Sequence, residues 1–353
     1  MATDIHAGDI ADMLNGSLPD LGKGRITDLT SVLQRYTALP RLMNKERLKF
    51  DTGRSIQFTV LTTTPGNARN VGLFAQDNLG QADGTEVGNV PWRHQTDGYH
   101  FDFRQALMNR SPAKIVDFVD TKRLQMMRDW AELHEANFWS EPSSSSDTLS
   151  PFGIRYWMVY NATAGFNGGN NTNFSGGPAG IDRDEVANWK NYTFQYTDAL
   201  AQDDLFRKLR KAIWETDFQP SLTNSPIPAY GGKSQFGIYT TYDTESQIAE
   251  LLESRNEQLG RKVDPMDGKA MLRSINIEAV PYLQKNDQGS DPIVGINWAV
   301  FHAISLKGAW MKPTPLKESP LSHVTLESHM DNTNNFVCHD CRRMFIGAKS
   351  TWH

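Results

Sequence analysis

The motif Cys338-His339-Asp340-Cys341 has the residue types and spacing that are most suited to chemistry in this sequence. Cysteines separated by two residues bind zinc or act as a redox pair. A structural zinc site needs four protein ligands, and the chain has only two cysteines. The apolar residues around the motif predict a strand, on which residues three apart point to opposite faces, so we expect structural cysteines and no metal site. The histidines available to complete a zinc site, which is the alternative, are His302, His323, His329 and His353.

Two further motifs resemble nucleotide-binding or catalytic patterns only in part. The segment from Gly231 to Ser234 ends like a phosphate-binding Walker loop, but the opening glycine of that pattern is missing. Asp264 and Asp267 enclose a Pro-Met pair, which is typical of a turn. The sequence has no Ser-His-Asp elbow and no His-Glu-x-x-His motif. We therefore expect no catalytic residues, no cofactor and no enzymatic activity.

The composition is that of a folded protein without a disulfide framework. The chain has 353 residues, of which 39% are hydrophobic and 22% are charged, so more than one compact domain is expected. No apolar run approaches the roughly 20 residues that cross a bilayer, and no secretory signal opens the chain. We therefore expect a protein that assembles inside a cell and does not associate with a membrane. The formal net charge is -5, and the cluster Arg207-Lys208 with Arg210-Lys211 is typical of a solvated helix face. We therefore expect no sequence-specific binding of DNA.

The region from Ile56 to Phe103 has the pattern of an arm that leaves the body of the protein. Ile56, Phe58 and Val60 alternate with polar residues, which predicts a half-buried strand. Residues 64–91 are rich in Gly, Asn, Asp and Gln, which predicts a long loop, and such loops are usually functional. Alternation resumes from Trp92 to Phe103 and predicts the returning strand. We expect an extended hairpin that lies across a neighbouring subunit.

A long helix follows this arm. Ser111 is a suitable N-cap and Pro112 suits the first helical position. Apolar residues at helical spacing predict a helix over about 112–138, which Pro142 and a run of serines bring to an end. A shorter helix is expected at Ile26–Leu33, before the arm. The tryptophans in or beside regular elements are expected in the core or at subunit contacts; they are Trp92, Trp130, Trp139 and Trp157.

The remaining sequence predicts a mixture of helices and strands without regular βαβ units, which is an α+β arrangement. Helices are expected from Asp203 to Glu215 and from Asp243 or Thr244 to Gly260. A Gly/Asn-rich loop is expected over residues 166–180, either well solvated or held by a neighbour. The expected strands are residues 151–160, 271–280, 292–301 and 336–347.

The order of these elements, together with several short sequence segments, resembles that of the major capsid proteins of tailed bacteriophages, which have the Hong Kong 97-type fold. The resemblance covers residues 25 to 350. The segments that carry it are PWRHQTDGYHFDFRQALMN, PFGIRYWMVYNATAGFNGGN, LLESRNEQLGRKVDPMDGKAMLRSINIEAVPYL, PIVGINWAVF, LKGAWM and NNFVCHDCRRMFIG. It implies an α+β chain divided into an N-terminal arm (1–50), an E-loop hairpin (51–110), a peripheral domain with the spine helix (111–220), an axial domain (221–305) and a return to the peripheral domain (306–353).

The resemblance also implies a structural function. Many copies would form the pentamers and hexamers of an icosahedral virion shell that encloses double-stranded DNA and is assembled in the host cytoplasm. Expected partners besides the chain itself are a separate scaffolding protein, a portal and a decoration protein. The residues that we expect at subunit contacts are Arg69, Phe74, Trp92, Arg93, Tyr99 and Trp130.

One departure from the family concerns covalent cross-linking. Some members join the E-loop to a neighbour by a Lys-Asn isopeptide bond, but this chain has no lysine between Lys49 and Lys114. We therefore expect a shell held by noncovalent contacts. Three other functions remain as alternatives. They are another virion protein such as a decoration or tail-tube subunit, a metal-dependent hydrolase, and a carbohydrate-binding module with exposed tryptophans.

Overall fold

A long six-stranded sheet forms one end of the molecule. The computed structural model describes residues 33–40, 47–50, 53–73, 80–81, 83–104, 112–174, 176–197, 202–218, 235–255, 271–272, 275–320 and 322–352. Strand β14 (Ser322–Cys338) is the centre of the sheet, and ten of its residues pair antiparallel with all of β4 (Arg93–Asp102). The other strands are β1 (Arg47–Phe50), β11 (Phe301–Leu306), β12 (Lys312–Pro313) and β13 (Lys317–Ser319).

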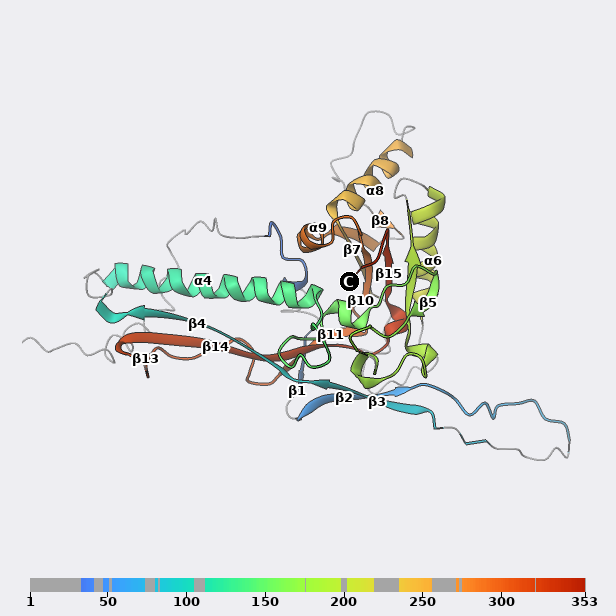
Figure 1. Cartoon of the computed structure of the whole chain (residues 1–353), viewed down its shortest axis with the longest axis horizontal. Helices are drawn as coiled ribbons and strands as arrows, with labels where there is room; N and C mark the ends of the chain where they lie inside the picture. The colour runs from blue at the N-terminus through green and yellow to red at the C-terminus, as the bar shows by residue number, and fades with distance from the viewer. Residues whose placement is uncertain are drawn as a thin grey trace, which may run out of the picture.

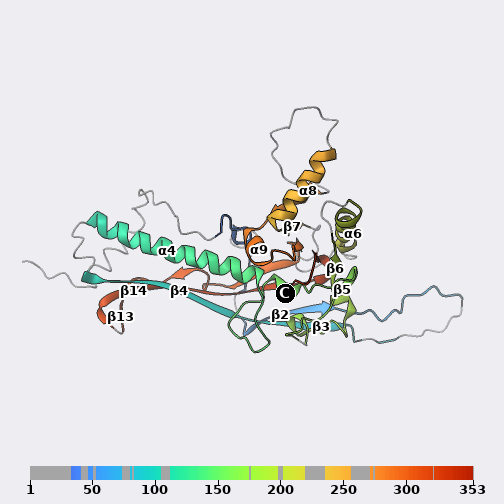
Figure 2. The ribbon, with the colours of Figure 1, turned by 45° about the horizontal axis from the view of Figure 1, so that its top comes forward.

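Helix α4 (Pro112–Trp139) lies along β4 and β14 (Figures 1 and 2). Tyr99 and Phe101 from β4 meet Val119, Met126 and Trp130 from the helix in a common apolar cluster. The expected helix over about 112–138 is therefore confirmed. Its apolar positions recur at helical spacing and cover one face of the sheet, which is the arrangement that such a stripe requires.

A seven-stranded sheet forms the second body (Figure 1). Its strand order is β5-β6-β15-β10-β7-β9-β8. Helices α6 (Arg207–Thr216) and α8 (Tyr242–Arg255) share an apolar cluster with strands of this sheet. The π-helical turn η4 (Gln202–Phe206) precedes α6, and α9 (Pro281–Asn286) follows β9. The strands are β5 (Gly165–Gly168), β6 (Asn191–Gln195), β7 (Phe236–Thr240), β8 (Met271–Leu272), β9 (Ile275–Ala279), β10 (Ile293–Asn297) and β15 (Phe345–Ala348).

The expected arm is present, but its two strands differ from the expected pair. Strand β2 (Ser55–Leu61) pairs antiparallel with β3 (Thr85–Pro91), so the last seven residues of the expected long loop form a strand. The stretch that was expected to return from the arm, β4, pairs instead with β14. Only Trp92 separates β3 from β4, so one chain segment leaves the arm and joins the long sheet. Figures 1 and 2 show the arm projecting from the body beside the seven-stranded sheet.

Residues 151–160 do not form the expected strand. They contain a short helix, α5 (Ile154–Trp157), and its neighbours are irregular. Gly153 lies so close to the carbonyl oxygens at the end of α4 that a side chain there would overlap them. The aromatic side chains are buried by this close packing, and Trp157 Nε1 donates hydrogen bonds to the carbonyls of Phe152 and Phe336.

The motif Cys338 to Cys341 also departs from the expected strand. Strand β14 ends at Cys338, and the short 3-10 helix η5 (Cys341–Arg343) begins three residues later. The Asp340 carboxylate accepts a hydrogen bond from the Arg342 amide at 3.1 Å, which favours a turn over an extended chain.

Several other expectations can be compared with the structure. Helices α6 and α8 and strands β10 and β15 are confirmed, and the tryptophans Trp130, Trp139 and Trp157 are buried in the core. The single strand expected over residues 271–280 is wrong, because β8 and β9 pair antiparallel with each other. The Gly/Asn-rich loop is held by its own subunit, as described below. The remaining elements are the short helices η2 (Pro178–Gly180) and η3 (Ala187–Trp189). Outside the described residues lie all of the expected N-terminal helix except Leu33, and Ser111, the Gly231–Ser234 turn, Gly260, Asp264 and Asp267.

Candidate subunit-contact surfaces

The base of the β2–β3 arm is packed firmly against the body. Ile56 and Val90 face each other across the two strands and are 1% and 0% exposed. Phe58 points the same way and lies 6.2 Å from Trp189 and 5.0 Å from His339, measured between ring centroids. Ile56 and Phe58 are alternate residues of β2, so their side chains lie on one face of the ribbon. The packing of this face against the body fixes the direction in which the arm leaves it.

The outer part of the arm exposes apolar side chains. Leu61, Val71, Leu73 and Val87 are 69%, 62%, 94% and 56% exposed, and they make up four of the ten large exposed apolar residues of the described chain. Asn67 holds the two sides of the arm together, because its amide both donates to and accepts from the backbone of Gly80 at 2.8 Å. The arm is therefore an ordered ribbon whose apolar surface has no cover within the described part of the subunit.

The backbone of the arm also has open edges. Strands β2 and β3 form a sheet of two, and no other described strand pairs with them. A two-stranded ribbon is marginally stable by itself in water, and unpaired strand edges attract other chains. Both properties make this ribbon a candidate contact surface.

The six residues expected at subunit contacts have different surroundings. Arg69 is on the exposed part of the arm, and Phe74 lies outside the described residues. Trp92 is half-buried at the base of the arm, where its Nε1 donates to the Gly53 carbonyl at 2.9 Å. The other three, Arg93, Tyr99 and Trp130, are 6%, 9% and 2% exposed. These three side chains pack inside the subunit and leave almost no area for a neighbour.

Arg93 shows what such a buried residue does instead. Its guanidinium donates to the carbonyls of Thr148 and Asp147, and it lies 5.3 Å from the centroid of the Phe152 ring. Burial lowers the pKa of Arg93. The residue therefore fixes the serine-rich loop after α4 to the start of β4.

Helix α4 and the following loop provide apolar surface that the sequence analysis did not identify. Leu124 and Met127 lie three residues apart and are 53% and 37% exposed, Leu133 is 42% exposed, and Leu149 in the loop is 78% exposed. Leu124 lies two residues before the buried Met126, so the helical spacing places it on the opposite face of α4. The four exposed residues are additional candidates for subunit contacts.

The Gly/Asn-rich loop is organised around one buried cation. Arg183 is completely buried, and its guanidinium donates to the carbonyls of Gly169 at 2.9 Å and Trp157 at 2.7 Å and to Asn191 Oδ1 at 3.1 Å. Asn170 also accepts from the Arg183 amide at 3.0 Å. These bonds satisfy backbone carbonyls of the loop that would otherwise be buried without a donor.

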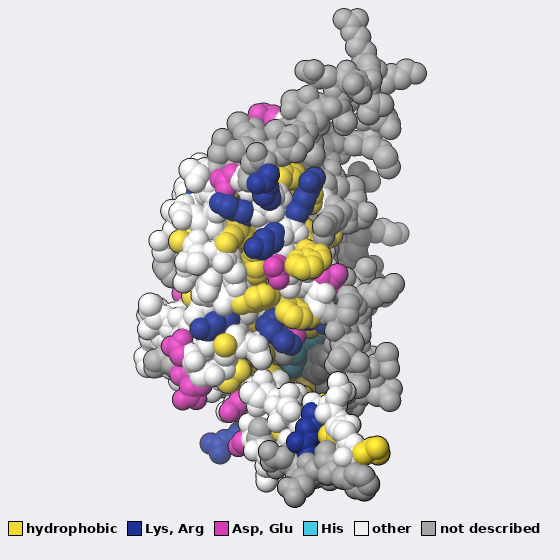
Figure 3. Space-filling model, turned by 90° about the vertical axis from the view of Figure 1, so that its right-hand side faces the viewer, with side chains coloured by type: hydrophobic (Ala, Val, Ile, Leu, Met, Phe, Trp, Pro, Cys, Tyr) yellow, Lys and Arg dark blue, Asp and Glu magenta, His cyan; other side chains and the backbone are white. Residues whose placement is uncertain are grey.

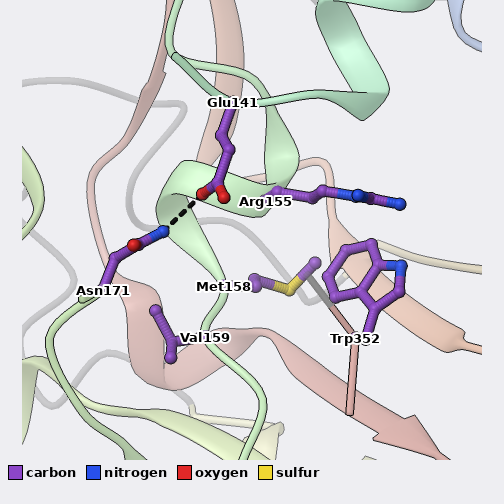
Figure 4. Close-up of a pocket in the computed structure, with 6 residues that line it drawn as sticks. All are labelled: Glu141, Arg155, Met158, Val159, Asn171 and Trp352. Atoms are coloured by element: carbon purple, nitrogen blue, oxygen red, sulfur yellow. Dashed lines mark hydrogen bonds between the residues drawn. The ribbon is translucent and has the colours of Figure 1, made fainter. Parts of the chain in front are cut away.

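A small pocket lies near the C-terminal end of the described chain (Figure 4). Asn171 donates to Glu141 on one side of it, and the Arg155 guanidinium lies 4.8 Å from the centroid of the Trp352 ring on the other. Arg155 also forms an ion pair with Asp287, whose side chain is 5% exposed. These contacts join distant segments of the chain, so Asn171, Glu141 and Arg155 all have structural roles.

The two cysteines are free thiols and both are completely buried. The Cys338 thiol contacts the Met344 sulfur at 3.9 Å, and burial raises the pKa of Cys338. No group of three His, Cys, Asp or Glu side chains within the described ranges is placed to hold a metal ion. None of the described helices is long and apolar enough to cross a membrane.

Comparisons with known proteins identify the fold. No protein-family model and no curated protein sequence matches the chain. The capsid asymmetric unit of cyanophage A-1(L) matches with a TM-score of 0.60 at 13% identity, over 93% of this chain and 96% of that chain. The capsid of a native GTA particle matches with a TM-score of 0.55 at 9% identity, over 95% and 99%. The holo-SrpI encapsulin complex from Synechococcus elongatus PCC 7942 matches with a TM-score of 0.50 at 7% identity, over 93% of each chain.

These matches span nearly the whole length of each pair of chains. At such low identities they establish the fold and no more. The chain has the Hong Kong 97-type α+β fold that its sequence pattern resembles, the fold found in these capsid and encapsulin structures.

Proposed function

We propose that this chain is the major capsid protein of a phage-like icosahedral shell, a structural subunit without catalytic activity. One observation carries the proposal: an ordered two-stranded arm exposes four large apolar residues and two unpaired edges. Covering Leu73 alone in a neighbour's surface stabilises the contact by about 2 kcal/mol. A subunit that stays alone gains nothing from such an arm, whereas a subunit in a shell uses it in every copy.

The geometry of the arm favours rings over symmetric dimers. The arm projects to one side of the body (Figures 1 and 2), so the surface that gives the arm differs from the surface that receives it. Contacts of this kind pass from head to tail and close into rings when the rotation allows. Pentamers and hexamers are the rings from which an icosahedral shell is built. In this setting Arg69 and Trp92 are the two of the six expected contact residues that are described and retain accessible side chains.

The remaining partners follow from the same proposal. A separate scaffolding protein, a portal and a decoration protein would complete a virion, and the shell would enclose double-stranded DNA. The net charge of -5 suits an inner shell surface that does not bind the phosphates of the enclosed DNA at fixed positions. Assembly would take place in the host cytoplasm.

The test is assembly of the full chain and of two variants at one position. Wild-type protein should give capsomer-sized rings or closed shells in negative-stain microscopy. Leu73→Asp should raise the concentration for half-assembly roughly thirtyfold, because a buried contact worth about 2 kcal/mol is lost. Leu73→Met is the matched control and should assemble like wild type. Normal assembly of Leu73→Asp contradicts the role given to the arm.

The content of the particles separates the proposal from its rivals. The encapsulin match shows that this fold also occurs in a structure that is not named as a phage capsid. Particles purified from the natural source should contain nuclease-protected double-stranded DNA. Particles that contain only protein would assign the chain to a compartment shell, and tubes or a persistent monomer would favour a tail or decoration subunit.

A further inference from the structure

The two helices that cover the seven-stranded sheet have opposite charges. Helix α6 has four cations and one acidic residue over Arg207–Thr216, whereas α8 has four acidic residues and one cation over Tyr242–Arg255. Helix α6 packs against β6 near one end of the sheet, and α8 packs against β9 near the other end. This part of the molecule therefore has a basic end and an acidic end.

The outer face of α6 is a stripe of exposed side chains, which we call the α6 stripe. It consists of Arg207, Arg210, Lys211 and Trp214, spaced so that they share one face of the helix, and Trp214 is 65% exposed. The opposite face, with Leu209 and Ile213, is buried in the sheet cluster. Arg210 and Lys211 form no ion pair with any residue within the described ranges. Figure 3 shows Lys and Arg side chains gathered with hydrophobic ones on this side of the molecule.

An exposed indole beside exposed cations is typical of a contact surface. Tryptophan and arginine are enriched at the centres of interfaces. The indole ring buries apolar area there, and the cation forms oriented contacts with acidic groups. A solvated helix face has no need of an exposed tryptophan. The composition of the stripe predicts an acidic partner.

The acidic helix of a second copy has matching properties. Asp243 and Glu250 are exposed and lie seven residues apart, so they share one face of α8. Tyr242 at the start of the helix is 60% exposed and gives this surface an aromatic residue as well. The two surfaces lie near opposite ends of one sheet.

The arm indicates which copy brings these surfaces together. In both ribbon views α6 lies on the side toward which the β2–β3 arm projects (Figures 1 and 2). A neighbour that is covered by the arm is therefore adjacent to the α6 stripe. The contact runs from head to tail, like the arm contact, so the same ring uses both.

We propose that the α6 stripe of one copy docks on the acidic face of α8 in the next copy around the ring. The inference rests on the proposed shell function, and it adds which helices adjoin and which charges set the register. Complementary charges steer encounter and reject wrong registers more than they add affinity. The arm then supplies most of the buried apolar area, and the helix pair supplies the orientation.

The test exchanges one charge on each helix. Lys211→Glu and Glu250→Lys should each raise the concentration for half-assembly about tenfold in sedimentation velocity, because one attraction is replaced by a repulsion. The double variant Lys211→Glu/Glu250→Lys should return to within about twofold of wild type, because every interface again holds opposite charges. Circular dichroism and thermal melting should show that all three variants are folded.

A matched control and two contrary outcomes complete the test. Lys312→Glu makes the same change of net charge on the exposed strand β12. The double variant Lys312→Glu/Glu250→Lys should assemble as poorly as Glu250→Lys alone. Failure of the Lys211/Glu250 exchange to restore assembly overturns the inference. So does a result in which Lys211→Glu loses bound DNA while Glu250→Lys assembles normally, since the stripe would then bind a polyanion. A wild-type chain that never associates contradicts the shell function itself, whereas association that ignores both charges contradicts this inference alone.

Discussion

The ring of Phe58 lies edge-on to the imidazole of His339, with 5.0 Å between their centroids and 78° between their planes. Phe58 belongs to the arm and His339 follows the last residue of β14, so this contact joins the arm to the centre of the body. Edge-to-face aromatic pairs add roughly 1 kcal/mol to the area that they bury. The direction of the arm therefore depends on a small aromatic cluster at its base.

Gly88→Ala should weaken the base of the arm. The Phe58 ring covers Gly88 on the paired strand, and an added Cβ would overlap that ring. Overpacking of this kind costs about 1–3 kcal/mol. Hydrogen exchange of the β2–β3 amides should therefore become faster, with a smaller change in the rest of the chain. Gly72→Ala is the matched control because its Cβ meets no atom within 4 Å, and an equal effect of both changes would contradict this account.

Arg183→Met should destabilise the subunit by about 3 kcal/mol, because it leaves buried carbonyls of the Gly/Asn-rich loop without donors. The cation makes bonds to Trp157, Gly169 and Asn191 at once. Urea unfolding of the Leu73→Asp background would measure the loss without interference from assembly. Lys190→Met is the control: its ion pair with the 76% exposed Asp184 spans 3.8 Å, so it should cost well under 1 kcal/mol. Equal losses would show that burial of Arg183 is not what matters.

The elements that the sequence predicted correctly have patterns that depend on near neighbours. The helix over 112–138 follows from a proline at its start and from apolar residues at helical spacing. Strand β2 follows from simple alternation. In both cases most of the buried face is apolar, with His134 and Glu135 as the buried polar exceptions in the helix, so the period is visible in the residue types.

Strand β14 lacked such a visible period. Its buried positions include Asn332, Asn334 and Asn335, whose side chains form hydrogen bonds inside the core. Asn332 donates to Gln95 at 3.0 Å, and Asn335 accepts from the Phe152 amide at 2.8 Å and donates to the Pro91 carbonyl at 2.8 Å. These partners are more than 180 residues away in sequence. Only the three-dimensional structure shows that a polar segment forms the central strand.

The contact residues were hard to predict for a related reason. Tyr99 and Trp130 are large aromatic residues that suit a core and an interface equally well, and the structure places both in the core. The pairing of β3 with β2 was missed because residues 85–91 contain Gly88 and few apolar side chains. Sequence patterns therefore indicated that an arm exists, but not which side chains it exposes.

Stability should fall as the pH is lowered from 7 to 5. Burial lowers the pKa of His134 and of His339 to about 3, and for His339 the neighbouring His302 adds to the effect. An unfolded histidine titrates near 6.5, so below that pH the unfolded chain binds protons that the folded chain does not. The stability contributed by the neutral rings is complete above about pH 6.5 and is lost as the pH falls toward 3. Each histidine should account for about 2 kcal/mol at pH 5.

Urea unfolding of the Leu73→Asp background at pH 7 and pH 5 measures this dependence without assembly. His339→Gln should reduce the difference between the two pH values by about half. His100→Gln changes an exposed histidine and is the control. If the free energy of unfolding of the Leu73→Asp background differs by less than about 1 kcal/mol between pH 7 and pH 5, the folded chain accepts these protons.

Assembled particles should dissolve into monomers on denaturing gels. No lysine lies between Lys49 and Lys114, so the arm has no amine to form an isopeptide bond with a neighbour. Burial of the exposed apolar residues of the arm and pairing of its edges must then hold neighbouring subunits together. A single band near 39.7 kDa from boiled particles is the expected result, and a ladder of multimers would contradict it. Because noncovalent contacts reverse, urea should also release intact subunits that assemble again after its removal, whereas a covalently joined shell would not come apart in this way.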